Sequence, residues 1–185
     1  FLDLKSEVDE IKGRVQEMVD KILYTNTNFI LGQELYNFEE NYSKYIHSKY
    51  CIGVGNGTDA LEIAIQSLEL DEGSEIITQS NTFISTCLGI THNKHKIKLV
   101  DIDINTYQMD LDLLEKSITN KTKVILIVHL TGSCCDMEKL CNIVNKHNLI
   151  LIEDCAQCAG AVFNGKKLGS FGILSTHSFY PGKNL

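Results

Sequence analysis

The sequence has one arginine, one proline and no long apolar run, and each of these scarcities excludes a class of protein. Arg14 is the single arginine, and 17 basic against 24 acidic residues leave a net charge of −7. Such a chain has no basic face, which argues against nucleic-acid binding. No stretch reaches the roughly 18 apolar residues of a membrane span, and no secretory signal opens the chain. The absence of Pro- or Gly/Ser-rich runs leaves no candidate interdomain linker.

The remaining composition is that of an ordinary globular protein. Its 185 residues are 43% hydrophobic and 22% charged, which suits one domain with a full core. The seven cysteines are odd in number and lie among apolar residues, which indicates a reduced, cytoplasmic protein and not a disulfide framework. The start at Phe1 and the stop at Leu185, just after a Pro-Gly-Lys-Asn turn, suggest two cut ends.

The hydrophobic periodicity changes near Tyr50. Before it, apolar residues recur every three or four positions from Leu4 to Ile22, which predicts an amphipathic helix, and a second helix is predicted over 34–46. After it, short apolar runs alternate with amphipathic segments. The predicted strands are 51–54, 75–78, 97–100, 124–128, 149–153 and 173–179, and the predicted helices between them are 58–68, 82–92, 111–117 and 137–147. This alternation implies βαβ crossovers. We therefore predict an α/β fold of three layers with a mostly parallel, doubly wound sheet and ligands beyond the carboxyl ends of its strands.

The segment from Gly55 to Leu61 follows the first predicted strand and opens a helix. Its glycines allow a tight turn, and the first amides of a helix are unpaired, so an anion such as phosphate could bind at Gly57, Thr58 and Asp59. A dinucleotide fingerprint would need glycine in place of Thr58, and a P-loop would need Gly-Lys-Ser/Thr. An N-capped helix after a tight turn explains the same residues without a ligand.

Polar side chains follow the last two apolar strands. Asp154 ends one of them, and a carboxylate there is costly unless it meets a cation or several donors. The alternatives are that Asp154 caps a helix and that Gln157, one helical turn further on, is polar surface. Lys183 lies in a Gly/Pro turn after the last strand, near Ser178. It is either a solvated lysine or a Schiff-base lysine whose pKa is lowered by burial beside a cofactor.

The cysteines offer a further alternative. Cys155 and Cys158 form a Cys-x-x-Cys pair, and Cys134 and Cys135 are adjacent, so together they could form a four-thiolate zinc site or a redox pair. The second pair lacks the ligand spacing, and neither has the glycines and polar turns of a zinc ribbon. Small core residues explain the cysteines better.

Eight motifs together resemble the DegT/DnrJ/EryC1/StrS family of sugar aminotransferases, pyridoxal-phosphate enzymes of fold type I. The likeness extends over the whole chain. The motifs are Phe1-Leu2-Asp3-Leu4, Phe29-Ile30-Leu31-Gly32 followed by Phe38-Glu39, 53–61, Asn81-Thr82-Phe83, His129-Leu130 with Asp136-Met137, Glu153-Asp154-Cys155-Ala156-Gln157, Gly169-Ser170-Phe171-Gly172 and 178–185.

The resemblance implies a role for each candidate residue. Lys183 would carry pyridoxal phosphate and act as the catalytic base and acid, and Asp154 would pair with the protonated pyridine nitrogen. The other cofactor contacts would be Gln157 at the phenolic oxygen, Phe83 stacked on the ring, and Gly57, Thr58, Asp59 and Ser178 at the phosphate. Related dehydratases have histidine in place of the lysine, so Lys183 favours transamination.

The resemblance also implies a substrate class and a domain plan. The expected reaction moves an amino group from glutamate to a nucleotide-linked keto-6-deoxy sugar, a dTDP-3-keto sugar in preference to a 4-keto sugar, in a cytoplasmic homodimer. The expected domains are an amino-terminal helical segment, 1–48, and an incomplete cofactor-binding large domain, 49–185, without the carboxy-terminal domain. Ala159, where relatives commonly have histidine, and the loop 131–135 depart from the family pattern. The alternatives are an inactive, truncated homologue that dimerises and a cysteine-based metal or redox module.

Overall fold

The computed structural model describes residues 3–183, without the side chain of Asn26. The chain forms two compact units, 1–53 and 54–185, close to the predicted domains 1–48 and 49–185, which remain a prediction. No helix among the described residues is long and apolar enough to cross a bilayer.

The first unit contains both helices predicted for it. Helix α1 (Leu4–Lys21) continues as a short π-helix, η1 (Ile22–Asn26), and α2 (Gln33–Ile46) follows. Asp3 caps α1 by accepting the Ser6 N–H at 3.1 Å. The apolar face of α1 remains open: no residue of this helix is buried, and the apolar side chains of its face are between 40% and 55% exposed.

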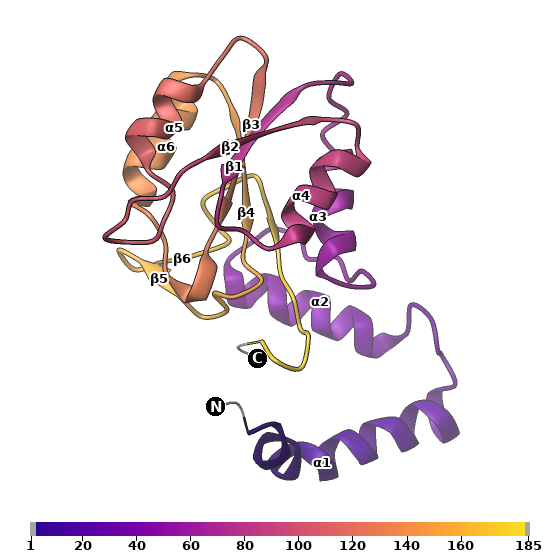
Figure 1. Cartoon of the computed structure of the whole chain (residues 1–185). Helices are drawn as coiled ribbons and strands as arrows, with labels where there is room; N and C mark the ends of the chain where they lie inside the picture. The colour runs from indigo at the N-terminus through magenta and orange to yellow at the C-terminus, as the bar shows by residue number, and fades with distance from the viewer. Residues whose placement is uncertain (1–2, 184–185) are drawn as a thin grey trace. The chain divides into compact units, whose positions relative to one another are not determined.

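The second unit is built on five parallel strands in the order β2-β1-β3-β4-β7 (Figure 1). The strands are β1 (Glu75–Gln79), β2 (Lys96–Val100), β3 (Thr122–Val128), β4 (Ile150–Asp154) and β7 (Leu174–Thr176). The register sets Val128 beside Asp154 and Asp154 beside Thr176. Three neighbouring strands therefore end at the same edge of the sheet.

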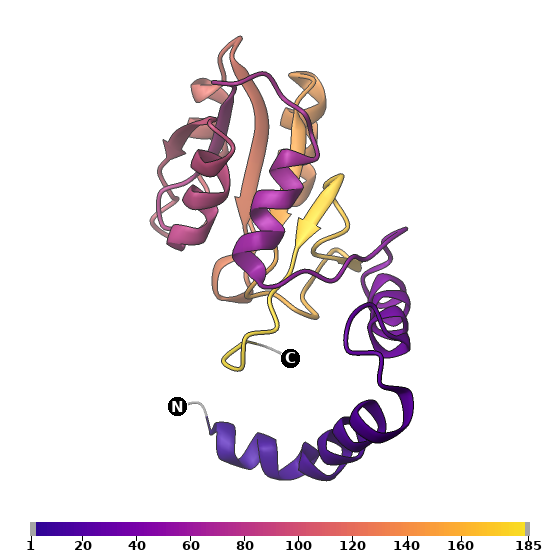
Figure 2. The same ribbon diagram turned by 90° about the vertical axis from the view of Figure 1, so that its right-hand side faces the viewer.

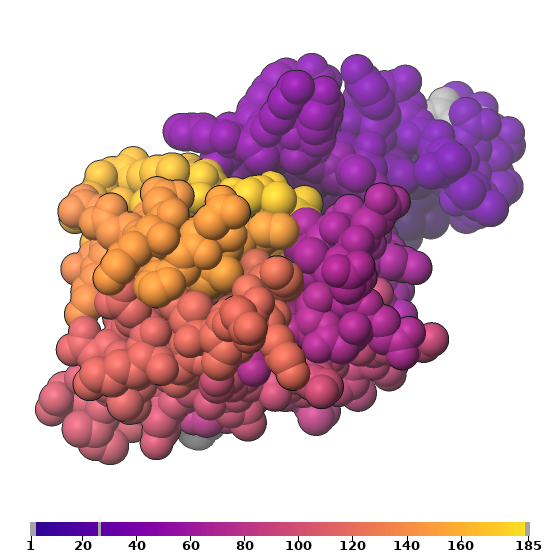
Figure 3. Space-filling model, turned by 90° about the horizontal axis from the view of Figure 1, so that it is seen from above, coloured from indigo at the N-terminus to yellow at the C-terminus, as the bar shows by residue number. Residues whose placement is uncertain are grey.

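Helices cover both faces of this sheet (Figures 1 and 2). They are α3 (Gly57–Gln66) and α4 (Ile84–His92) on one face, and α5 (Leu111–Ser117) and α6 (Met137–Lys146) on the other. Alternate strand residues enter the two cores: Leu126 and Ile152 pack with α3 and α4, and Ile125 and Leu151 pack with α5 and α6. In Figure 3 the magenta atoms of α3 and the orange atoms of α6 lie on opposite sides of this unit. The predicted three-layer, doubly wound α/β fold is confirmed.

Two predicted strands differ from the structure. The segment 51–54 is not a strand, because its backbone pairs elsewhere: the Gly53 N–H donates to Glu39 Oε1 at 2.7 Å, and Ile52 is 78% exposed. The predicted strand 173–179 is shortened to the three residues of β7. Between β4 and β7, a two-stranded antiparallel ribbon, β5 (Val162–Phe163) and β6 (Lys166–Lys167), was not predicted. Strands this short have no periodicity that a sequence pattern can reveal.

Candidate active site

The candidate residues gather where the parallel strands end and α3 begins, at the lower edge of the sheet in Figure 1. They are Phe83 after β1, Asp154 at the end of β4 with Gln157 behind it, Ser178 and Lys183 after β7, and Gly57, Thr58 and Asp59 at the start of α3. Doubly wound folds place ligands at this edge. The topology therefore supports one site, and the roles of these residues toward a cofactor remain predictions.

Asp154 is a buried carboxylate, 4% exposed, with one hydrogen bond to each oxygen. The Ala156 N–H donates to Oδ1 at 3.1 Å, and the Thr86 hydroxyl donates to Oδ2 at 3.0 Å. Burial raises the pKa of Asp154, and these donors and the charges of His129 and Lys183 offset only part of the rise. A buried carboxylate in this state favours a cationic partner, because a cation stabilises its ionised form.

The turn after Asp154 fixes the side chain of Gln157. The residues that follow Asp154, 155–161, form turns and no helix, so the interpretation of Asp154 as a helix cap is wrong. The Thr131 N–H donates to Gln157 Oε1 at 2.9 Å. Because that bond uses the amide oxygen, the NH₂ group is the end of Gln157 that can donate to a ligand oxygen.

Two of the backbone amides at the start of α3, which we expected from the sequence to be unpaired, already have a hydrogen-bond partner. The side chain of Asn56 accepts the N–H groups of Thr58 at 2.9 Å and Asp59 at 3.0 Å, two of the amides expected to be unpaired. The Thr58 hydroxyl lies 2.8 Å from the Ser85 hydroxyl. A methyl group at Gly57 would lie 3.2 Å from Cβ of the neighbouring residue 178, so the absence of a side chain lets the two backbones approach. An anion at this end of α3 would replace the Asn56 cap at one or both amides, or bind beside it.

Phe83 and Lys183 complete the set. Phe83 is the residue just before α4, and its side chain is 66% exposed. Lys183 is half-buried in a turn closed by its own N–H, which donates to the Tyr180 carbonyl at 2.8 Å. Lys183 also contributes to lowering the pKa of Asp154, although less than the hydrogen-bond donors of this carboxylate do.

These residues fit pyridoxal phosphate, a group with a basic ring nitrogen, a phenolic oxygen and a phosphate. Asp154 offers a buried anion for the ring nitrogen, and the oriented amide of Gln157 offers a donor for the phenolic oxygen. The hydroxyls of Thr58, Ser85 and Ser178 border the start of α3, where a phosphate is favoured.

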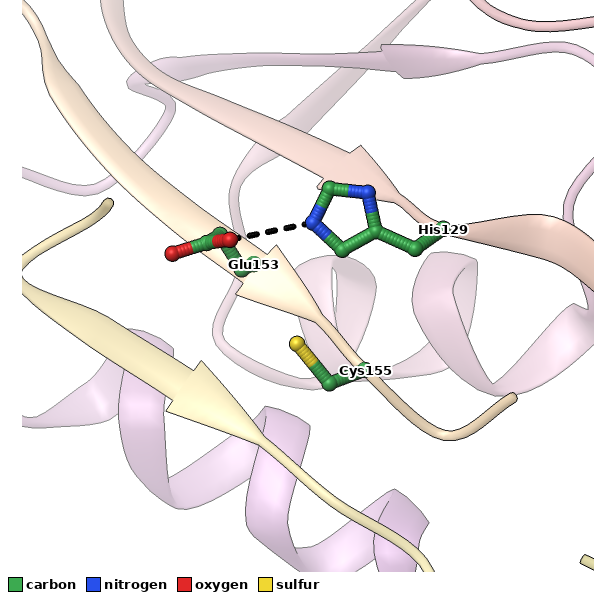
Figure 4. Close-up of side chains that lie close together, drawn as sticks. All are labelled: His129, Glu153 and Cys155. Carbon is green, nitrogen blue, oxygen red and sulfur yellow. Dashed lines mark hydrogen bonds and ion pairs between the residues drawn. The ribbon is translucent and has the colours of Figure 1, made fainter. Parts of the chain in front are cut away.

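A second buried network lies beside the site and was not predicted from the sequence (Figure 4). Glu153 is fully buried, and its carboxylate accepts three backbone N–H groups and the Nε2 of His129 at 3.0 Å. Burial raises the pKa of Glu153, but the imidazole and the amides of Gly172 and Gly169 outweigh it and hold the pKa below its ordinary value. The three amides come from a turn 16 to 19 residues further along the chain, so local sequence patterns carry no signal for them.

The cysteines do not form the four-thiolate arrangement considered from the sequence. The ligand atoms of His129, Glu153 and Cys155 lie within 4.8 Å of one another, which makes them the one cluster of metal-ligand type among residues 3–183. Glu153 already accepts four hydrogen bonds, so a metal would have to displace some of them. Burial raises the pKa of Cys155 well above that of an ordinary thiol and that of Cys135 to about 12, which keeps both protonated and unreactive.

Comparison with known proteins places the chain among sugar aminotransferases. The model of the DegT/DnrJ/EryC1/StrS aminotransferase family matches residues 9–185. A dTDP-3-amino-3,6-dideoxy-alpha-D-galactopyranose transaminase of Aneurinibacillus thermoaerophilus is 45% identical over 97% of this chain and 49% of its own. A GDP-perosamine synthase of Escherichia coli O157:H7 is 37% identical over 95% and 48%. The crystal structure of DesV from S. venezuelae has a TM-score of 0.95 at 34% identity, over 100% of this chain and 50% of DesV. The chain thus spans about half the length of these relatives.

Proposed function

The chain belongs to the DegT/DnrJ/EryC1/StrS aminotransferase family, and we propose that the protein containing it is a pyridoxal-phosphate-dependent nucleotide-sugar aminotransferase. It moves an amino group from glutamate to a keto-6-deoxy sugar linked to a nucleotide, and works as a homodimer. The observation that carries the proposal is Asp154, a carboxylate that is buried at the end of the parallel strand β4 and has only two hydrogen-bond donors among residues 3–183.

The proposed mechanism assigns one task to each side chain. Pyridoxal phosphate, when bound, supplies an electron sink for the carbon that loses a proton. Lys183 would hold the cofactor through Nζ, and, once an amino donor has taken its place there, its amine would move a proton as general base and acid. Asp154 holds a proton at the pyridine nitrogen, Gln157 donates to the phenolic oxygen, and Phe83 covers a ring face.

The substrate is the finer part of the proposal. The dTDP-linked 3-amino-3,6-dideoxy sugar in the name of the Aneurinibacillus relative favours a dTDP-3-keto-6-deoxy sugar. The GDP-linked sugar of the Escherichia coli relative makes other nucleotides necessary controls. A 4-keto sugar is the competing substrate.

The first experiment locates the attachment point in the full-length protein. Borohydride reduction of the loaded protein, followed by peptide mass spectrometry, should find the cofactor on Lys183. Lys183→Ala should lose both the adduct and transamination, whereas Lys123→Ala, at an exposed lysine of β3, should keep both. An adduct on another lysine would overturn the assignment.

The second experiment tests the substrate. The full-length protein is assayed with glutamate and dTDP-linked 3-keto and 4-keto sugars, with the GDP-linked sugars as controls, and 2-oxoglutarate release is followed. Faster turnover of the 3-keto sugar supports the proposal. If only the 4-keto sugar is turned over, the substrate assignment changes to a 4-keto sugar. If no sugar is turned over, the proposed substrate class is refuted.

A further inference from the structure

Two threonines at the start of α4, one in its first turn and one just before it, form a hydrogen-bonded pair that reaches the buried carboxylate. Thr86 is fully buried, and its hydroxyl donates to Asp154 Oδ2 at 3.0 Å. Thr82 lies one turn earlier, with its hydroxyl 2.7 Å from that of Thr86. The pair joins α4 to the end of β4 across 68 residues of sequence.

The direction of these two hydrogen bonds follows from the number of protons. An ionised carboxylate only accepts, so the single hydroxyl proton of Thr86 goes to Asp154. The oxygen of Thr86 must then accept the proton of Thr82. The two hydroxyls form a directed chain that ends on the carboxylate, and hydrogen bonds in such a chain polarise one another.

This chain acts on a carboxylate with few other donors. The Ala156 N–H holds Oδ1 and the Thr86 hydroxyl holds Oδ2, so the two bonds together fix the plane of the carboxylate. The titratable groups that interact with it are His129, after β3, Lys183, after β7, and the adjacent Cys155. Burial favours the protonated form of Asp154, and a hydroxyl that donates to the anion opposes this effect.

We propose that Thr86, oriented by Thr82, is a positioning residue that keeps the Asp154 carboxylate ionised and in a fixed plane toward the ring nitrogen of pyridoxal phosphate. The inference rests on the proposed function. Loss of the hydroxyl makes the carboxylate more basic, so the proton shared by the ring nitrogen and Asp154 moves to Asp154. If the hydrogen bond between α4 and β4 had a purely structural role, its loss would leave that proton on the ring nitrogen.

The test measures the proton directly in the full-length protein. The protein is loaded with pyridoxal phosphate isotopically labelled at the ring nitrogen, and the nitrogen chemical shift is followed by NMR against pH. In Thr86→Val, which keeps the shape of the side chain, the ratio of protonated to unprotonated nitrogen should fall about ten-fold. Thr86→Ser should restore it to within about two-fold of the parent protein. Thr91→Val is the matched control, because that hydroxyl bonds only to carbonyls of its own helix.

A second variant covers a failure of Thr86→Val to fold. Thr82→Val leaves Thr86 in place and removes only the donor to it, so the ratio should fall about three-fold. An unchanged nitrogen shift in every folded Thr86→Val or Thr82→Val protein overturns the inference while the proposed function stands. Failure of the parent protein to attach the cofactor at Lys183 overturns both.

Discussion

Replacement of Glu153 by glutamine should destabilise the protein by about 3 kcal/mol, although the change removes only one charge and keeps the shape. The carboxylate is fully buried. Its Oε1 accepts the N–H groups of Phe171 at 2.6 Å and Gly172 at 2.7 Å. Its Oε2 accepts the Gly169 N–H at 2.8 Å and His129 Nε2 at 3.0 Å.

The magnitude follows from how a glutamine amide could occupy this place. If its oxygen faces Phe171 and Gly172, its NH₂ group faces the Gly169 N–H and His129. The imidazole can accept at Nε2 only if its proton moves to Nδ1, which is buried and has no hydrogen-bond partner among the described residues. The Gly169 N–H cannot adapt, and a buried donor without a partner costs about 1–3 kcal/mol. The bonds that remain lose the help of the negative charge, which adds about 1 kcal/mol.

Urea unfolding of the full-length protein, followed by circular dichroism, measures the difference. Glu138→Gln is the matched control, because Glu138 is exposed and accepts from Asn164 Nδ2 at 2.9 Å. It should change the free energy of unfolding by less than about 0.5 kcal/mol. A loss below about 1 kcal/mol in Glu153→Gln would refute the assigned network.

The pH dependence gives an independent check on the same network. Burial opposes the charge of Glu153, but its hydrogen-bond donors hold its pKa in the folded protein below the ordinary value of 4.5. The folded state therefore binds fewer protons than the unfolded state near that value. The stabilisation is present above pH 4.5 and is lost as the pH falls through the lower pKa of the folded state. Glu153→Gln should lack this acid-dependent loss, and equal slopes in both proteins would contradict the argument.

Three further predictions concern other parts of the chain. Asp154→Asn should keep the fold but slow the proton transfer by orders of magnitude in single-turnover measurements, because the neutral amide cannot hold the pyridine proton; unchanged rates would exclude this role. Burial lowers the pKa of His177 from 6.5 to about 4, so the free energy of unfolding should fall by about 3 kcal/mol as the pH falls through this range, and His177→Gln should remove that pH dependence; a pH dependence that persists in the variant would have to come from another group. Residues 1–185 expressed alone should show no transamination, because the face of α1 is open and Arg14 is the only arginine available for a donor carboxylate; robust turnover would contradict this.

Most of the fold could be predicted from the spacing of apolar residues, because each long helix or strand keeps a single hydrophobic period along its length. Helix α5 begins and ends at the predicted residues, and β1 to β4 differ from the predictions by at most two residues at either end. The strand predicted at 51–54 was wrong, because an apolar run does not reveal whether a neighbouring strand exists to pair with it. Ribbon β5–β6 was missed because two-residue strands have no repeat.

The candidate site could be predicted only in part. The carboxyl edge of the sheet followed from topology, and Asp154 and Lys183 stood out as polar residues after strands. The partners of these residues could not be predicted, because Thr86, in α4, and Asp154, at the end of β4, meet only after three crossovers have assembled the sheet. The capping role of Asn56 could not be predicted for another reason. A capping side chain competes with a ligand for the same amides, and the sequence does not indicate which one occupies them.

The adjacent acids at the end of β4 illustrate how the fold separates structural from functional charge. Successive strand residues point to opposite faces of the sheet, so Glu153 and Asp154 enter different surroundings although they are neighbours in sequence. Glu153 meets three amides and an imidazole, which outweigh the cost of burial and lower its pKa. Asp154 faces α4 and accepts hydrogen bonds from one amide and one hydroxyl. These two donors do not outweigh the cost of burial, so the pKa of Asp154 is raised. The first carboxylate is satisfied within the protein and stabilises the turn at 169–172. The second retains the capacity to bind a cation, and this difference supports the proposal that Asp154, and not Glu153, contacts the cofactor.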